Sequence, residues 1–294
     1  MNIRPKTSLN WLWWGLGTFF ILVLTFRLGA LSTNSSLDTT GEKVGIVKIT
    51  GPIISSESIN SQLEKFKNRK DISAIVLRID SPGGLVAPTQ EIYEKVKSIR
   101  DVKPIVSSMG SVAASGGYYI ALGSDTLIAN PGTIVGSIGV IMNYPIATEL
   151  LDKVGIKFET VKSGIYKDIL SPDKPLSDEG RELLQGLIDE SYKQFTEAVA
   201  EGSNLSVYDL KKFADGRIFT GTQAKELGLV DEIGDEFVAR DLAAEMVKID
   251  PKIQPVTFGK KKKKILGLIP GSKIIDKIIK NIFFEVNSSN KILW

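Results

Sequence analysis

The stretch Ala74-Ile-Val-Leu-Arg-Ile-Asp-Ser-Pro-Gly-Gly84 decides the fold, because a short apolar run leads directly into a glycine-rich turn. The run is rich in aliphatic and β-branched side chains and predicts a buried strand. In the turn, Pro82 fixes its own φ, while Gly83 and Gly84 permit positive φ and a close approach of backbone. Two successive N–H groups at such a turn can face an oxyanion or simply serve a tight turn.

Outward from this stretch, short apolar runs alternate with amphipathic segments. The predicted strands are 44–50, 74–79, 105–109, 126–129 and 158–161. The predicted helices are 90–99, 115–122, 146–154, 178–201, 207–213, 221–227 and 236–246. Strands that alternate with helices predict an α/β fold with a parallel sheet. We expect one domain over residues 44–250, since no internal repeat is found there.

A second glycine-rich loop, Ser111-Val-Ala-Ala-Ser-Gly-Gly-Tyr-Tyr-Ile-Ala121, again follows an apolar run. Ser115 is expected where the strand turns into a small-residue helix, close to the positive end of that helix. A serine there can attack a carbonyl whose oxyanion the amides of Ser115 and Gly116 stabilise. The alternative is that Ser115 simply caps the helix. A third loop, residues 131–140, suggests only tight packing when it is taken singly.

The composition restricts the chemistry, because the 294 residues include neither cysteine nor histidine. Disulfides, thiolate zinc sites, cysteine nucleophiles and Ser-His-Asp triads are therefore excluded. A hydrolase with this composition needs a lysine or a carboxylate as general base. A lysine acts as a base only as a neutral amine, which burial favours. Lys162 and Lys167 both lie just past the predicted strand 158–161, and spacing does not choose between them.

Four motifs in this order, 80–84, 110–119, 135–140 and 162–168, resemble the signal peptide peptidase A family. Its members are membrane-anchored serine proteases with a serine–lysine dyad. The resemblance covers about residues 44–248, including a family-like stretch over 219–231. It implies a Clp-protease/crotonase-like fold, a spiral of βαβ units.

The resemblance also implies roles for individual residues. Ser115 would be the nucleophile and Lys167, not Lys162, the base. Ser137 would hold the lysine amine in line, and the amides of Gly83 and Gly116 would form the oxyanion hole. No metal or organic cofactor is expected.

This chain has one domain, whereas the long form of the family has two in tandem. By the resemblance, short forms complete the site between subunits, so we expect a homo-oligomer in which Ser115 and Lys167 can belong to different chains. The expected function is a serine endopeptidase that degrades remnant signal peptides and other apolar peptides released in the membrane. Three alternatives remain: a related protease with a different membrane-protein substrate, a crotonase-type acyl-CoA enzyme, and an inactive membrane scaffold.

An uncharged, tryptophan-rich run over residues 8–26 predicts an uncleaved transmembrane anchor over residues 9–31, in which Arg27 near the end can reach the membrane interface. Its 23 residues span about 35 Å as a helix, enough for a bilayer core of about 30 Å. Arg4 and Lys6 precede it, so residues 1–8 are expected in the cytoplasm and the catalytic domain outside, beyond a polar tether over 32–43. A cleaved signal peptide is the competing interpretation.

Charge is distributed unevenly along the chain. Residues 38–259 carry more acidic than basic residues, which argues against nucleic-acid binding by the main domain. The tail, residues 251–294, contains five consecutive lysines from Lys260 to Lys264 and an apolar helical face beyond them. This pattern predicts contact with a lipid bilayer, with the globular domain or with a neighbouring subunit.

Overall fold

The computed structural model describes residues 42–203, 205–251 and 255–258. Contacts divide the chain into residues 1–41 and residues 42–294, and the described residues all belong to the second unit. The predicted anchor over 9–31 and the tail beyond residue 258 lie outside the described residues. Within the described ranges, no helix combines the length and the apolar character that crossing a bilayer requires.

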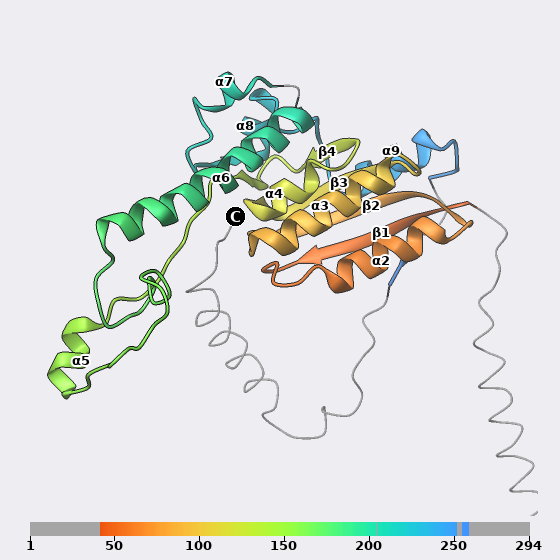
Figure 1. Ribbon diagram of the computed structural model, residues 1–294. Helices are drawn as coiled ribbons and strands as arrows, with labels where there is room; N and C mark the ends of the chain where they lie inside the picture. Colours follow the sequence, from red (N-terminus) through yellow and green to blue (C-terminus); the bar gives the residue numbers. More distant parts are fainter. Residues whose placement is uncertain (1–41, 204, 252–254, 259–294) are drawn as a thin grey trace, which may run out of the picture. The chain divides into compact units, whose positions relative to one another are not determined.

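A mixed sheet with helices on both faces forms the centre of the described structure (Figure 1). The eight described strands are β1 Lys43–Thr50, β2 Ile72–Ser81, β3 Ile105–Ala114, β4 Thr126–Ala129, β5 Ile134–Gly136, β6 Ile218–Thr220, β7 Glu232–Ile233 and β8 Val256–Thr257. Their order is β6-β5-β3-β2-β1-β8, and β4 pairs with both β3 and β7. Each of these pairs is parallel except β5 with β6.

The described helices are α2 Glu57–Asn68, α3 Val86–Arg100, α4 Gly116–Ala121, α5 Thr148–Val154, α6 Asp178–Ser203, α7 Val207–Leu210, α8 Gly221–Glu226 and α9 Glu236–Met246. Side chains of α2, α3, α4 and α6 join one face of the sheet in the larger core. Helix α9 packs its alanines against the other face. In β1, Val47 and Ile49 enter the first core and Val44 and Ile46 the second. Burial on both faces explains why the central strands are continuous apolar runs.

The predicted α/β architecture is confirmed and is consistent with a Clp-protease-like fold. Four of the predicted strands and all the predicted helices are present, with ends that differ by a few residues. Helix α2 was not predicted, because it buries only Leu63 and Phe66 and its sequence is polar apart from these two residues and Ile59. Strand β8 lies in the stretch assigned to the tail, and Phe258 beyond it stacks on Phe66 with ring centroids 4.5 Å apart.

Residues 141–177, here called the excursion, leave the sheet after β5 and return to it through α6 (Figure 1). They carry α5, which buries none of its residues. The predicted strand over 158–161 is wrong, since these residues form no strand and pair with none of the described strands. Phe158 is 60% exposed and Val161 is 99% exposed, so the apolar side chains that suggested a strand have no sheet to join.

Candidate active site

Ser115 lies at the junction between β3 and α4 in an unusual backbone conformation. Its φ is 54° and its ψ is −123°, a region that costs a residue other than glycine about 1–3 kcal/mol. Two hydrogen bonds hold it there: its N–H donates to the Gly136 carbonyl at 2.8 Å, and its carbonyl accepts from the Tyr119 N–H at 2.9 Å. The conformation is therefore imposed by β5 on one side and by α4 on the other.

The capping alternative for Ser115 is wrong. The residue occupies the N-cap position of α4, but its side chain makes no capping hydrogen bond. Within the described residues its hydroxyl has no hydrogen-bond partner, although only 4% of the residue is exposed. A nearly buried serine with a free hydroxyl on a strained turn is the arrangement that a nucleophile requires.

Ser137 lies beside Ser115, because the strands that precede the two serines are paired. Ala114 of β3 is opposite Gly136 of β5, and each serine follows its paired residue. Ser137 also has a positive φ, 52°, and its N–H donates to the Arg217 carbonyl at 2.8 Å. The structure thus brings together two serines that are 22 positions apart in the chain.

The glycine turn 83–84 lies against the start of α4. A Cβ on Gly116 would come within 3.3 Å of the Gly83 Cα and 2.8 Å of the Thr89 Oγ1, so only glycine fits at 116 without displacing a neighbour. Gly83 has a φ of 97°. Its N–H donates to the Ser81 hydroxyl at a long 3.2 Å, whereas the Gly116 N–H has no acceptor within the described residues. Both predicted oxyanion amides are therefore placed at Ser115.

Two polar residues of β2 support this turn, and the sequence analysis gave them no role. Ser81 is fully buried and donates its hydroxyl to the Gly51 carbonyl at 2.7 Å while it accepts from Gly83. Asp80 Oδ1 accepts from the Val112 N–H at 3.1 Å. Their signal in the sequence is a pair of polar residues directly after a buried apolar strand.

Two tyrosines anchor α4 in the core. The Tyr118 hydroxyl donates to the Leu229 carbonyl at 2.8 Å, and complete burial raises the pKa of this side chain. Tyr119 packs edge to face against Tyr93 and Phe195, with ring centroids 4.7 and 5.1 Å away. Burial raises the pKa of Tyr119 to about 12, so both tyrosines stay neutral at ordinary pH. The helix that follows Ser115 is therefore fixed from behind by aromatic packing.

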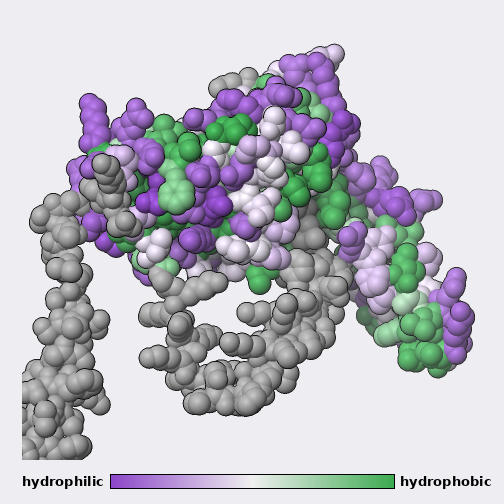
Figure 2. Space-filling view, turned by 180° about the vertical axis from the view of Figure 1, so that it is seen from behind, coloured by the Kyte–Doolittle hydropathy of each residue, from purple (hydrophilic) through white to green (hydrophobic). Residues whose placement is uncertain are grey.

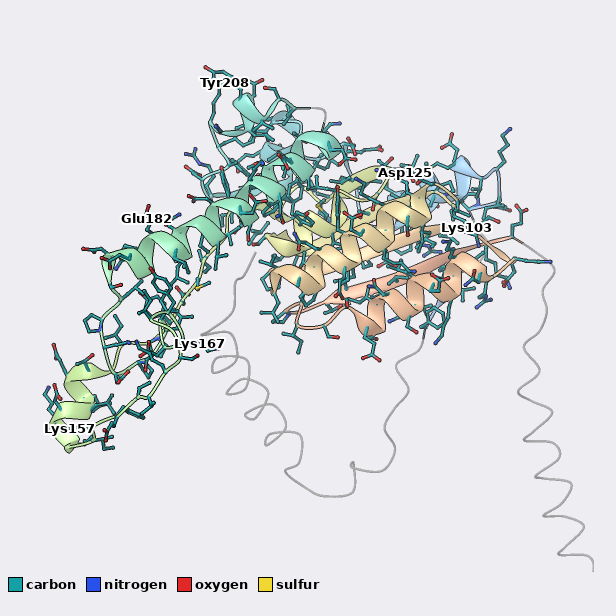
Figure 3. All side chains as sticks on the ribbon, viewed as in Figure 1. Lys103, Asp125, Lys157, Lys167, Glu182 and Tyr208 are labelled. Atoms are coloured by element: carbon teal, nitrogen blue, oxygen red, sulfur yellow. The ribbon has the colours of Figure 1, made fainter. Side chains whose placement is uncertain are left out.

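Lys167 is not close to Ser115 within one chain. It lies on the excursion, apart from α4 (Figure 3), and its side chain is exposed. Within the described residues its amine has no hydrogen bond or ion pair. Its backbone N–H donates to the Gly164 carbonyl at 3.2 Å. The structure therefore assembles the serines and glycines of the predicted site but leaves the predicted base in solvent.

Lys162, the competing base, is already engaged. Its Nζ lies 2.7 Å from Asp168 Oδ1 and 3.1 Å from the Ile165 carbonyl. Hydrogen bonds from Lys162 and then Lys174 lower the pKa of Asp168 to about 2, so its carboxylate remains charged. An ion-paired ammonium cannot take a proton, which favours Lys167 of the two lysines.

The excursion exposes a large amount of apolar surface, which Figure 2 shows at the lower right. Nine large apolar side chains between residues 141 and 166 are at least 43% exposed: Ile141, Ile146, Leu150, Val154, Ile156, Phe158, Val161, Ile165 and Tyr166. Leu183 and Leu187, one helical turn apart on α6, add to them. An exposed apolar surface of this extent is typical of a protein–protein or membrane contact.

Comparisons with known proteins identify relatives of this chain. The model of peptidase family S49 matches residues 97–250, and the Clp protease model matches residues 42–133. A protein of Synechocystis sp. that is named as a protease is 43% identical over 268 residues, which cover 87% of this chain and 96% of that protein. A protein of Enterococcus faecium named as signal peptide peptidase SppA is 37% identical over 71% of this chain and 60% of that protein. Protease 4 of Haemophilus influenzae is 33% identical over 70% of this chain, but over only 35% of its own length.

Proposed function

Because the chain belongs to peptidase family S49, we propose that it is a serine endopeptidase in which Ser115 is the nucleophile and Lys167 the general base. The observation that carries the proposal is the backbone of Ser115. A φ of 54° on a nearly buried serine is held by the Gly136 carbonyl and leaves the hydroxyl free. Such strain persists only where the surrounding structure imposes it, and it is concentrated at functional sites.

The reaction follows from the groups around Ser115. The neutral amine of Lys167 takes the proton of the Ser115 hydroxyl, and the alkoxide attacks the carbonyl carbon of the scissile peptide bond. The oxyanion accepts hydrogen bonds from the amides of Gly116 and Gly83, the latter in exchange for its long bond to Ser81. The ammonium then gives its proton to the leaving amine, and the acyl-enzyme is formed.

Water completes the cycle. Lys167 takes a proton from a water molecule, the hydroxide attacks the acyl carbon, and the ammonium returns the proton to the Ser115 oxygen as the ester bond breaks. Ser137 is adjacent to Ser115 through the β3–β5 pairing. Its hydroxyl forms a hydrogen bond with the Lys167 amine and keeps the amine aligned with the Ser115 hydroxyl. Each step is a proton transfer or an acyl transfer, and none calls for a metal or an organic cofactor.

We infer that the base comes from a second copy of the chain. Lys167 is exposed on the excursion. No residue of α5 is buried, and the apolar side chains around Lys167 are exposed in the described structure. Packing of the excursion against a neighbouring copy would bury these side chains and bring the amine to Ser115. The active enzyme is thus a homo-oligomer whose dyad is shared between subunits.

The proposed substrates are remnant signal peptides and other apolar peptides released in the membrane. Two relatives support this class: the E. faecium protein is named as a signal peptide peptidase, and an Arabidopsis thaliana relative, 29% identical, is named as chloroplastic serine protease SPPA. A related protease with another membrane-protein substrate is the second candidate, and only profiling of cleaved peptides separates the two. A crotonase-type acyl-CoA enzyme and an inactive scaffold are disfavoured by the free hydroxyl of Ser115.

We further propose that residues 9–31 anchor the chain in the cell membrane, with the N-terminus in the cytoplasm and the catalytic domain on the opposite side. The support is the uncharged run itself and the basic residues Arg4 and Lys6 before it. Protease added to intact spheroplasts should digest the domain. Complete protection in sealed, right-side-out membranes would contradict this topology.

Three substitutions test the mechanism. Ser115→Ala and Lys167→Ala should each lower kcat by about 10⁴-fold or more, because the two groups act as a unit. Lys162→Ala is the comparison variant and should lose far less activity than Lys167→Ala, because the Lys162 ammonium pairs with Asp168 and takes no part in the proton transfers. Peptide hydrolysis and labelling by a serine-directed probe are measured for each purified, folded variant. Near-normal turnover of Lys167→Ala would show that the base assignment is wrong.

A further inference from the structure

One carboxylate in the excursion holds two lysines at once. Asp168 Oδ1 lies 2.7 Å from Lys162 Nζ, and Asp168 Oδ2 lies 2.5 Å from Lys174 Nζ. The side chain of Asp168 is 15% exposed, whereas those of the two lysines are 32% and 40% exposed. The lysines are six residues before and six residues after the aspartate, so the ion pairs tie the segment together from both sides.

This cluster surrounds Lys167, which directly precedes Asp168, where little else fixes the backbone. Between α5 and α6 the excursion contains no described helix or strand. Three turns span the region: the N–H groups of Lys167, Ile169 and Ser171 donate to carbonyls three residues earlier, at 3.2, 3.2 and 3.0 Å. Val161 is 99% exposed and Ile165 is 72% exposed, and no residue from 161 to 177 is buried in the described structure, so the turns have little apolar support.

We propose that Asp168 is a positioning residue, which fixes the loop that presents Lys167 to the active site. The inference rests on the proposed function, because it assumes that Lys167 is the base. Asp168 contacts neither Ser115 nor the oxyanion amides, and it acts through the loop. By pairing with Lys162 and Lys174 it draws their ammonium groups to itself, while the Lys167 amine stays without a partner in the described structure.

Asp168 and its two lysines, here called the clamp, are charged at the pH at which a lysine acts as a base. The carboxylate stays ionised far below neutral pH, and Asp168 raises the pKa of Lys174 through their hydrogen bond. Between α5 and α6 the charged groups besides Lys167 are Lys157, Glu159, Lys162, Asp168, Asp173 and Lys174. The pair between Asp168 and Lys174 therefore persists as pH rises into the range in which a lysine with a lowered pKa loses its proton.

The test compares Asp168→Asn with the full-length wild-type protein in a peptide-hydrolysis assay. Asparagine keeps the shape of the side chain but has one acceptor oxygen and no charge, so it cannot hold both lysines. We expect kcat to fall by about tenfold to a hundredfold, the effect of a catalytic group misplaced by about 1 Å. KM should change little, since Asp168 does not contact substrate. Asp168→Glu, which retains two carboxylate oxygens, should recover part of kcat.

Asp173→Asn is the matched control, because it removes the same charge from the same loop. The Asp173 carboxylate accepts from the Ser171 hydroxyl and forms no ion pair with any residue that the structure describes. It should keep wild-type kcat. Lys162→Met combined with Lys174→Met leaves the carboxylate and removes its partners, and should reproduce the loss seen with Asp168→Asn. This double variant therefore tests the role of the two ion pairs even if Asp168→Asn folds poorly.

Two results separate this inference from the proposed function. If Lys167→Ala is inactive but Asp168→Asn keeps kcat within about twofold of wild type, an effect below the range expected for a displaced base, only the role of Asp168 is overturned. An equal loss in Asp173→Asn also overturns it, since the effect is then one of charge alone. If Lys167→Ala itself keeps turnover, the base assignment fails, and Asp168 has no catalytic amine to position.

Discussion

The two halves of the proposed dyad lie in regions of opposite character. Ser115 is 4% exposed, and its backbone is fixed by β5, by α4 and by the tyrosines behind α4. Lys167 is exposed on a segment without a described helix or strand, next to side chains that are apolar and unburied. One chain therefore completes the proposed nucleophile and oxyanion hole but holds the proposed base only loosely.

The difference follows from what supports each loop. The Ser115 turn ends a buried parallel strand and begins a helix, so the sheet and two cores resist any relaxation of its positive φ. The Lys167 loop depends on a few turns and one carboxylate that binds two lysines. If the site is divided between chains, as we propose, it is inactive until copies assemble, and proteolysis is confined to the oligomer.

The largest expected effect comes from mixing two inactive chains. Ser115→Ala supplies an intact Lys167 loop, and Lys167→Ala supplies an intact nucleophile. Co-expressed chains should regain a measurable part of wild-type kcat from a background about 10⁴-fold lower, if the dyad is shared between subunits. Hydrolysis by the purified mixed oligomer is the measurement.

The control for this experiment pairs Ser115→Ala with a chain that carries both substitutions. That mixture contains no nucleophile and should stay inactive. Wild-type turnover by a protein verified as monomeric would contradict the shared site, because a single chain would then contain the complete dyad.

A smaller effect is expected from Gly116→Ala, which perturbs the rigid region alone. The added Cβ would meet Thr89 Oγ1 at 2.8 Å and Gly83 Cα at 3.3 Å, so the turn has to move away from α4. Loss of one oxyanion donor lowers kcat by about 10²- to 10³-fold. The control is Gly132→Ala on the neighbouring loop, where a Cβ meets nothing within 4 Å. An active Gly116→Ala would show that the amides at this position do not hold the oxyanion.

The sequence predicts the rigid region better than the excursion. The apolar runs and glycine turns of β2 and β3 are local signals, and they place Ser115 at a strand-to-helix junction. Its positive φ and free hydroxyl depend on the Gly136 carbonyl, which comes from another strand and leaves no local signal.

In the excursion, local signals mislead. The apolar residues at 158–161 predicted a strand, because the sequence pattern of apolar residues is the same whether their side chains are exposed or buried. Spacing did not distinguish Lys162 from Lys167, since the difference is an ion pair formed only when the loop closes on Asp168. The resemblance to a known family supplied that choice before the geometry supported it.

The smallest expected effect is a pH-dependent loosening of the excursion alone. The folded-state pKa of Asp168 is about 2, below its ordinary value of 3.8, because Lys162 and Lys174 donate hydrogen bonds to the carboxylate. A carboxyl group with a lowered pKa stabilises the folded form above its unfolded pKa, and this contribution is lost as pH falls through the folded value. Between about pH 4 and pH 2 the Lys167 loop should therefore lose order, while the Ser115 turn, held by backbone bonds and apolar packing, should not.

Hydrogen exchange of the Lys167, Ile169 and Ser171 amides, compared with that of the Ser115 amide, measures the difference after correction for the intrinsic pH dependence. In Asp168→Asn the same three amides should exchange quickly already at pH 5 and show no such transition. Equal loss of protection at Ser115 and in the loop would mean that the two regions open together and that the contrast between them has no thermodynamic basis.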